Sequence, residues 1–137
     1  MIFEIELIVR IVISFVLTTI IGFEREISLK PAGLRTHVLV GIGSTLFTIL
    51  STQAFPGSDP SRLASSIVIG IGFIGAGTIV KTKEKIIGLT TAATLWITSS
   101  IGVAVGVGYY LLASIVAVFT FLILRFGKIE KEIPKQI

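Results

Sequence analysis

The chain has 137 residues, of which 53% are hydrophobic and 15% charged, with a formal net charge of +4 and a mean hydropathy of +0.97. Soluble domains carry about 25% charged residues, so this composition excludes an ordinary water-soluble domain and favours a membrane protein. The absence of cysteine excludes disulfides, thiolate metal sites and a cysteine nucleophile. Basic residues separate apolar runs instead of forming one block, which indicates the lipid bilayer and not nucleic acid as the partner.

Five apolar runs are long enough to cross about 30 Å of hydrocarbon as helices. The long run after Lys85 is split at residues 106–110, where glycines precede two tyrosines. The sequence predicts an all-α, polytopic bundle of five transmembrane helices in residues 1–126, followed by a short charged cytoplasmic tail over 127–137. The expected spans are Leu7–Phe23, Val38–Phe55, Ala64–Val80, Ile86 to about Val105, and Tyr109–Phe126.

The basic residues also predict an orientation, because lysine and arginine in short loops stay in the cytoplasm. They follow the first, third and fifth spans, whereas Arg62 is the basic residue of the loop between the second and third spans. We therefore expect the N-terminus outside and the C-terminus in the cytoplasm, an arrangement that requires an odd number of spans.

In the first span, Arg10 is an ionisable residue placed well inside the hydrocarbon. Glu6 lies one helical turn earlier and can pair with it, while Ser14 and Thr18 continue the same polar side. Alternatively, Arg10 extends its side chain toward the outer water layer.

The third span contains Gly70-x-Gly72-x-x-Gly75, the spacing of a dinucleotide-binding loop, but no acidic residue follows at the distance such a loop requires. On a helix, Gly70 and Gly77 share one face and Gly72 and Gly75 another, so neighbouring backbones can approach closely on both sides. We expect this helix to pack centrally in the bundle. Alternatively, it unwinds and its backbone carbonyls line a cation path.

The fourth span places Thr91, Thr94 and Thr98 on one face, which Gly102 and Gly106 continue. Hydroxyls and glycines in one stripe suit either an interhelical seam or the wall of an aqueous path. Trp96 lies near mid-bilayer, where we expect it in the bundle interior or at a subunit contact.

Metal binding and catalysis have little support in the pattern. The carboxylates Glu24, Glu26 and Glu84 lie on one side of the membrane and Asp59 on the other, so no dehydrated magnesium site can gather them. His37 is the single histidine and is expected at the membrane interface. No serine, histidine and aspartate have triad spacing. We expect no enzymatic activity and no cofactor. Binding of a hydrated magnesium ion at the cytoplasmic rim remains an open alternative.

Three segments resemble the signature blocks of the MgtC/SapB membrane protein family: GFEREISLKPAGLRTHVLVGIGSTL, DPSRLASSIVIGIGFIGAGTIV and GLTTAATLWITSSIGVAVGVGYY. The resemblance implies a multi-pass protein of the prokaryotic plasma membrane, associated with adaptation to low magnesium, survival inside host cells and modulation of the proton-translocating ATP synthase. The family's charged and polar positions fall on Glu24, Arg25, Glu26, Arg35, Thr36, His37, Asp59, Arg62 and Thr90.

The chain also departs from the family pattern. Many relatives have glutamine in place of Ser66, and some have asparagine in place of Thr90. Longer relatives append a soluble C-terminal regulatory domain, whereas this sequence ends at Ile137, so functions that need that domain are not assumed for it.

Two functions follow from these features. The first is a non-enzymatic regulator of magnesium homeostasis or membrane energetics, which acts through helix contacts. Its expected partners are a second copy of the chain, because two glycine faces exceed what five short helices need, and, by the resemblance, ATP synthase. The alternative is a small channel or transporter for magnesium or another cation, with the third helix lining its path.

Overall fold

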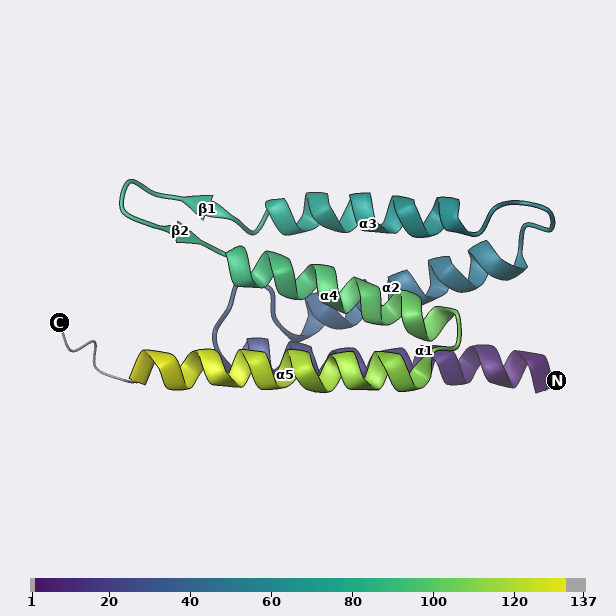
Figure 1. Ribbon diagram of the computed structural model, residues 1–137, viewed down its shortest axis with the longest axis horizontal. Helices are drawn as coiled ribbons and strands as arrows, with labels where there is room; N and C mark the ends of the chain where they lie inside the picture. Colours follow the sequence, from purple (N-terminus) through teal and green to yellow (C-terminus); the bar gives the residue numbers. More distant parts are fainter. Residues whose placement is uncertain (1, 133–137) are drawn as a thin grey trace.

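The computed structural model describes residues 2–132, which form five helices and one short hairpin. The helices lie side by side and alternate in direction, so α1 begins and α5 ends at opposite ends of the bundle (Figure 1). The elements are α1 (Ile2–Ile27), α2 (Leu34–Gln53), α3 (Ser61–Ala76), β1 (Val80–Lys81), β2 (Ile86–Ile87), α4 (Leu89–Gly106) and α5 (Tyr110–Glu132).

We call the end that holds the α1–α2 loop, the hairpin and the end of α5 the basic end (Figure 1). The other end, which holds the α2–α3 and α4–α5 loops, is called the opposite end. Arg25, Lys30, Lys81 and Lys83 belong to segments at the basic end.

Four helices are long and apolar enough to cross a membrane: α1, α2, α4 and α5. The helix α3 is apolar as well but has 16 residues. The predicted all-α membrane bundle is therefore confirmed. The predicted break within residues 106–110 is also confirmed, because α4 ends at Gly106, α5 begins at Tyr110, and Gly108 in the turn between them has φ of 90°.

The predicted end of the third span and the predicted start of the fourth are wrong. Val80 and Ile86 were expected inside spans but form the antiparallel hairpin, in which Val80 pairs with Ile87 and Lys81 with Ile86. The helix α5 continues to Glu132, past the expected start of the tail at Gly127, and the division between membrane part and cytoplasmic tail stays a prediction. Residues 133–137 of the expected tail lie outside the described part of the chain.

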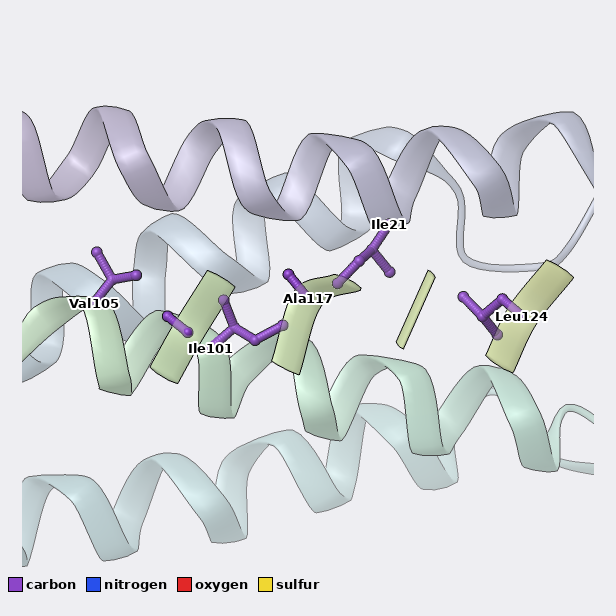
Figure 2. Close-up of a cluster of buried hydrophobic side chains, with 6 residues drawn as sticks. Ile21, Ile101, Val105, Ala117 and Leu124 are labelled. Carbon is purple, nitrogen blue, oxygen red and sulfur yellow. The ribbon is translucent and has the colours of Figure 1, made fainter. Parts of the chain in front are cut away.

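The apolar core lies among α1, α4 and α5, where Ile21, Ile101, Val105, Ala117 and Leu124 meet (Figure 2). The helix α2 packs against α1 and α4, and α3 packs against α2 and α4. Because α4 packs against all four other helices, it is the central helix.

The predicted central position of α3 is therefore wrong. Its buried residues are Ile71 and Gly75, and a side chain added at Gly70 or Gly72 would meet nothing within 4 Å. The glycines of α3 are divided between two faces, whereas α4 gathers Thr91, Thr94, Thr98, Gly102 and Gly106 on one face, which packs more closely against a neighbour.

Candidate functional site

Hydroxyl side chains form a buried polar seam among α1, α2 and α4. The Ser44 and Ser99 hydroxyls are 2.8 Å apart and join α2 to α4. The Thr45 hydroxyl donates to the Gly102 carbonyl at 2.9 Å. The seam consists of Ser14, Thr18, Ser44, Thr45, Thr48, Thr91, Thr94, Thr98 and Ser99, none more than 5% exposed.

Glycines let the helices of the seam touch. A Cβ atom added at Gly102 would lie 2.5 Å from the Gly41 carbonyl oxygen, and one added at Gly106 would lie 2.5 Å from Cβ of Thr48. Both distances are shorter than real Cβ contacts, so α2 and α4 approach at backbone level. The sequence allowed the stripe from Thr91 to Gly106 to be either an interhelical seam or the wall of an aqueous path. In the structure this stripe lies buried on one face of α4.

At the basic end, the seam meets a buried charged cluster of Glu24, Arg25, His37 and Thr91. Each of these residues is 4% exposed or less. Arg25 donates from Nη2 to the Thr91 hydroxyl at 3.1 Å, and its Nη1 lies 3.8 Å from Oε2 of Glu24. The Ser28 hydroxyl donates to Oε1 of Glu24 at 2.6 Å. The cluster therefore ties the end of α1 to the first turn of α4.

His37 belongs to this cluster because α1 and α2 cross closely at Gly22, where an added Cβ atom would lie 3.0 Å from Cβ of His37. Its side chain is completely buried, and its position at the level of the membrane interface stays a prediction. Nδ1 of His37 is 2.9 Å from the Gly33 carbonyl, which makes Nδ1 the protonated nitrogen. Nε2 is buried and has no hydrogen-bond partner among the described residues.

The other motif residues at the basic end are less buried. The Glu26 carboxylate accepts the backbone N–H of Leu34 at 2.9 Å and so caps the first turn of α2, where Gly33 has no side chain to do so. Arg35 and Thr90 are exposed, and Thr36 is half-buried.

Arg10 lies at the opposite end, where it donates to the Gly106 carbonyl and pairs with Glu6. Of the two alternatives, the pairing with Glu6 is present. The bond to Gly106 was not foreseen; it satisfies a carbonyl that the end of α4 leaves without an intrahelical donor.

Asp59 and Arg62 also lie at the opposite end, so the motif residues do not form one site. Asp59 accepts the hydroxyl and the backbone N–H of Ser61, each at 2.8 Å. These bonds, the one from the hydroxyl first, hold the pKa of the Asp59 carboxyl below its usual value. Arg62 is exposed.

The outer face of α3 is open. Ile69 is 74% exposed and Phe73 84%, and they flank Gly70 and Gly72. A Cβ atom added at Gly75 would lie 3.5 Å from Cβ of Ala92 in α4, so Gly75 faces that helix, while Gly77 ends α3 as its C-cap. Beside this face lies an apolar groove of about 500 Å³ between α2 and α3, whose lining includes Gly43, Phe47, Leu63, Ser66, Gly70 and Ile74.

Trp96 points outward and is 47% exposed, so its expected place in the bundle interior is wrong, and the subunit contact stays a prediction. Among the described residues, no group of three or more histidine, aspartate and glutamate side chains could hold a metal ion.

A second pocket, of about 710 Å³, lies at the basic end. The end of α1, the α1–α2 loop, β2, the first turn of α4 and the outer part of α5 contribute to its lining. Sequence reasoning missed this pocket, because no spacing along the chain shows that β2 and α5 lie together.

Comparison with known proteins identifies relatives. The profile of the MgtC family matches residues 11–132. The YhiD protein of Escherichia coli K12, provisionally named a magnesium transporter, is 46% identical over 128 residues, covering 88% of this chain and 60% of that protein. Protein MgtC of Brucella abortus strain 2308 is 44% identical over 106 residues, covering 77% of this chain and 44% of that protein.

A further relative, an uncharacterized protein of Synechocystis, is 42% identical over 105 residues, or 77% of this chain and 45% of that protein. The chain thus spans between 44% and 60% of the length of these three relatives. No solved structure matches the chain significantly.

Proposed function

The chain belongs to the MgtC family, and from this premise we propose that it serves magnesium homeostasis in a prokaryotic plasma membrane by binding partner helices through α3. The name of the Escherichia coli relative supports the link to magnesium. In this proposal the protein is not an enzyme, and its working surface is the outer face of α3 with the adjoining groove.

The observation that carries the proposal is the open surroundings of Gly70 and Gly72, which have no atom within 4 Å of an added Cβ. In lipid, helices associate where small residues let their backbones approach, because no hydrophobic effect separates helix from acyl chain. A second copy of the chain is the first partner we expect, since its α3 could pack on the exposed side of α3 at Gly72, next to the groove that Gly70 lines.

Tight packing inside the bundle also supports a contact function. The seam between α2 and α4 has no room for one methyl group at Gly102 or Gly106, so it leaves no wide path for a hydrated ion along that interface. Magnesium dehydrates reluctantly and prefers carboxylate oxygens with retained waters, and the seam supplies hydroxyls.

Transport is the second candidate, and one observation favours it. Buried polar side chains run along α1, α2 and α4 from Arg10 at the opposite end to Arg25 at the basic end. A rearrangement that separated α2 from α4 would open a path lined by these hydroxyls.

The test compares contact and flux in one preparation. Because the chain lacks cysteine, a Gly72→Cys variant reports α3–α3 contact as a disulfide-linked dimer in native membranes. We expect this dimer to form. We also expect the Gly72→Leu variant to fold but to lose the ability to support growth at low magnesium. In liposomes, we expect the protein to produce no magnesium flux. Ala93→Leu, at an exposed small residue of α4, is the matched control and should support growth.

Magnesium flux above that of empty liposomes, together with no crosslinked dimer in the Gly72→Cys variant, would contradict the contact proposal and favour transport. Crosslinking to another membrane protein, ATP synthase included, would keep the contact surface and change the partner.

A further inference from the structure

The pocket at the basic end has a polar floor and an apolar wall. Arg25, Lys30, Thr90 and Thr91 supply polar atoms. The wall includes Ile86, Ile87, Leu89 and Ile123, each at least 43% exposed. A ligand that fills this pocket therefore needs a polar group at one end and hydrocarbon at the other.

The polar floor favours an anion. Arg25 and Lys30 bring two positive charges, against one negative charge on Glu24, whose carboxylate already accepts the Ser28 hydroxyl. The first turn of α4 also opens on the pocket, because Gly88, Leu89, Thr90 and Thr91 all line it. No side chain caps this turn, so its N–H groups and the positive end of the helix dipole are available to a phosphate.

A second observation points to the same ligand. The Arg25 side chain lines the pocket although only 4% of its surface is exposed. Its Nη2 donates to Thr91 and its Nη1 lies 3.8 Å from Oε2 of Glu24, so the guanidinium is held in place with its positive charge at the floor of the pocket. Phosphate oxygens are suited to arginine because they accept two parallel N–H bonds.

We propose that this pocket binds the phosphate of a membrane phospholipid headgroup, with one acyl chain along the apolar wall. The location suits such a ligand, since the pocket lies at the end of the helices, beside the hairpin lysines Lys81, Lys83 and Lys85. Basic residues at that level attract anionic lipids. A free phosphate ion would satisfy the floor but would leave the apolar wall in water.

The test uses the full chain in neutral detergent. The ligands are phosphatidylglycerol, diacylglycerol with the same acyl chains, inorganic phosphate and magnesium chloride. Native mass spectrometry gives the bound stoichiometry and the dissociation constant, and thermal unfolding followed through Trp96 fluorescence gives stabilisation. We expect one tightly bound phosphatidylglycerol, a raised unfolding temperature, and weaker binding of diacylglycerol.

Arg25→Gln breaks the bond to Thr91 and can impair folding, so the decisive variant is Thr90→Glu. Thr90 is exposed in the first turn of α4, where a carboxylate suits the helix dipole but repels phosphate. We expect about tenfold weaker phosphatidylglycerol binding and unchanged or higher stability. Lys83→Gln changes the net charge equally at the same end, outside the pocket lining, and should retain the lipid.

Four results would overturn the proposal. Equal binding of diacylglycerol would mean that the phosphate is not recognised. Equal losses of phosphatidylglycerol binding in Thr90→Glu and Lys83→Gln would show that the net charge of this end, and not the pocket, determines binding. Stabilisation by inorganic phosphate that added phosphatidylglycerol does not displace would identify the free ion. Magnesium binding that Thr90→Glu strengthens would identify a cation site at Glu24.

Discussion

At the scale of single residues, the glycines of this chain fall into two groups that look alike in sequence. Gly102 and Gly106 sit where α2 touches α4, and an added methyl group would collide with backbone or with Thr48. Gly70 and Gly72 face open space. The same substitution should therefore have opposite effects in the two groups.

For the glycines, we compare Gly102→Ala with Gly70→Ala. The first forces α2 and α4 apart and should lower the free energy of unfolding by about 1–3 kcal/mol. The second should leave it unchanged or raise it by about 0.5–1 kcal/mol, because alanine restricts the unfolded backbone more than glycine. Reversible unfolding in detergent measures both, and equal destabilisation would contradict the assigned packing.

For Arg10, we expect Arg10→Met to cost about 1–3 kcal/mol, because the Gly106 carbonyl loses its donor. Glu6→Gln is the matched control. It disturbs the same ion pair at its half-exposed partner and should cost less than about 1 kcal/mol. If the two variants unfold alike, the ion pair and not the bond to Gly106 is the stabilising part.

Some single-residue features were predictable and others were not. The i, i+3 and i, i+4 spacing of Thr91, Thr94 and Thr98 places them on one helix face, and the structure has all three buried on one side of α4. The burial of His37 could not be foreseen, because it depends on the crossing of α1 and α2 at Gly22. That crossing is a long-range contact with no spacing signal.

At the scale of elements, the hairpin and the start of α4 depend on Gly88. Its φ is 94°, and an added Cβ atom would strike the Thr78 carbonyl oxygen. Gly57 also has a positive φ, of 80°, but open surroundings. The backbone conformation is shared by the two glycines, so only the collision distinguishes them.

For these loop glycines, Gly57→Ala should cost about 1–2 kcal/mol from the left-handed backbone alone, and Gly88→Ala should cost more. Hydrogen exchange in Gly88→Ala should rise across the hairpin and the first turn of α4, while the core around Ile101 stays protected. Equal exchange in both variants would mean that the Thr78 carbonyl moves away freely.

The element order was predictable from apolar runs, but which helix lies at the centre of the bundle was not. In a membrane protein, lipid-facing and protein-facing sides are both apolar, so hydropathy does not say which helix is central. The glycines of α3 suggested close packing, whereas the packing falls on α4, whose buried threonines and glycines share one face.

At the scale of the whole molecule, the arrangement of the five helices predicts that the two groups of loops lie on opposite sides of the bilayer. The cysteines of the variants Ser58→Cys and Thr82→Cys should react with an impermeant thiol reagent from opposite sides of sealed vesicles. Ala113→Cys, buried in the core, should stay unlabelled. Labelling of the first two from one side would refute the five-pass arrangement.

The shortness of α3 has a consequence for the surrounding bilayer. Its 16 residues span about 24 Å at 1.5 Å per residue, less than the roughly 30 Å of hydrocarbon beside it. Acyl chains next to α3 must compress or tilt, at a modest elastic cost for each ångström of mismatch. Two copies of α3 side by side share one locally thinned patch of bilayer, so the elastic cost favours contact between their outer faces. The same cost favours a location in thin regions of the membrane.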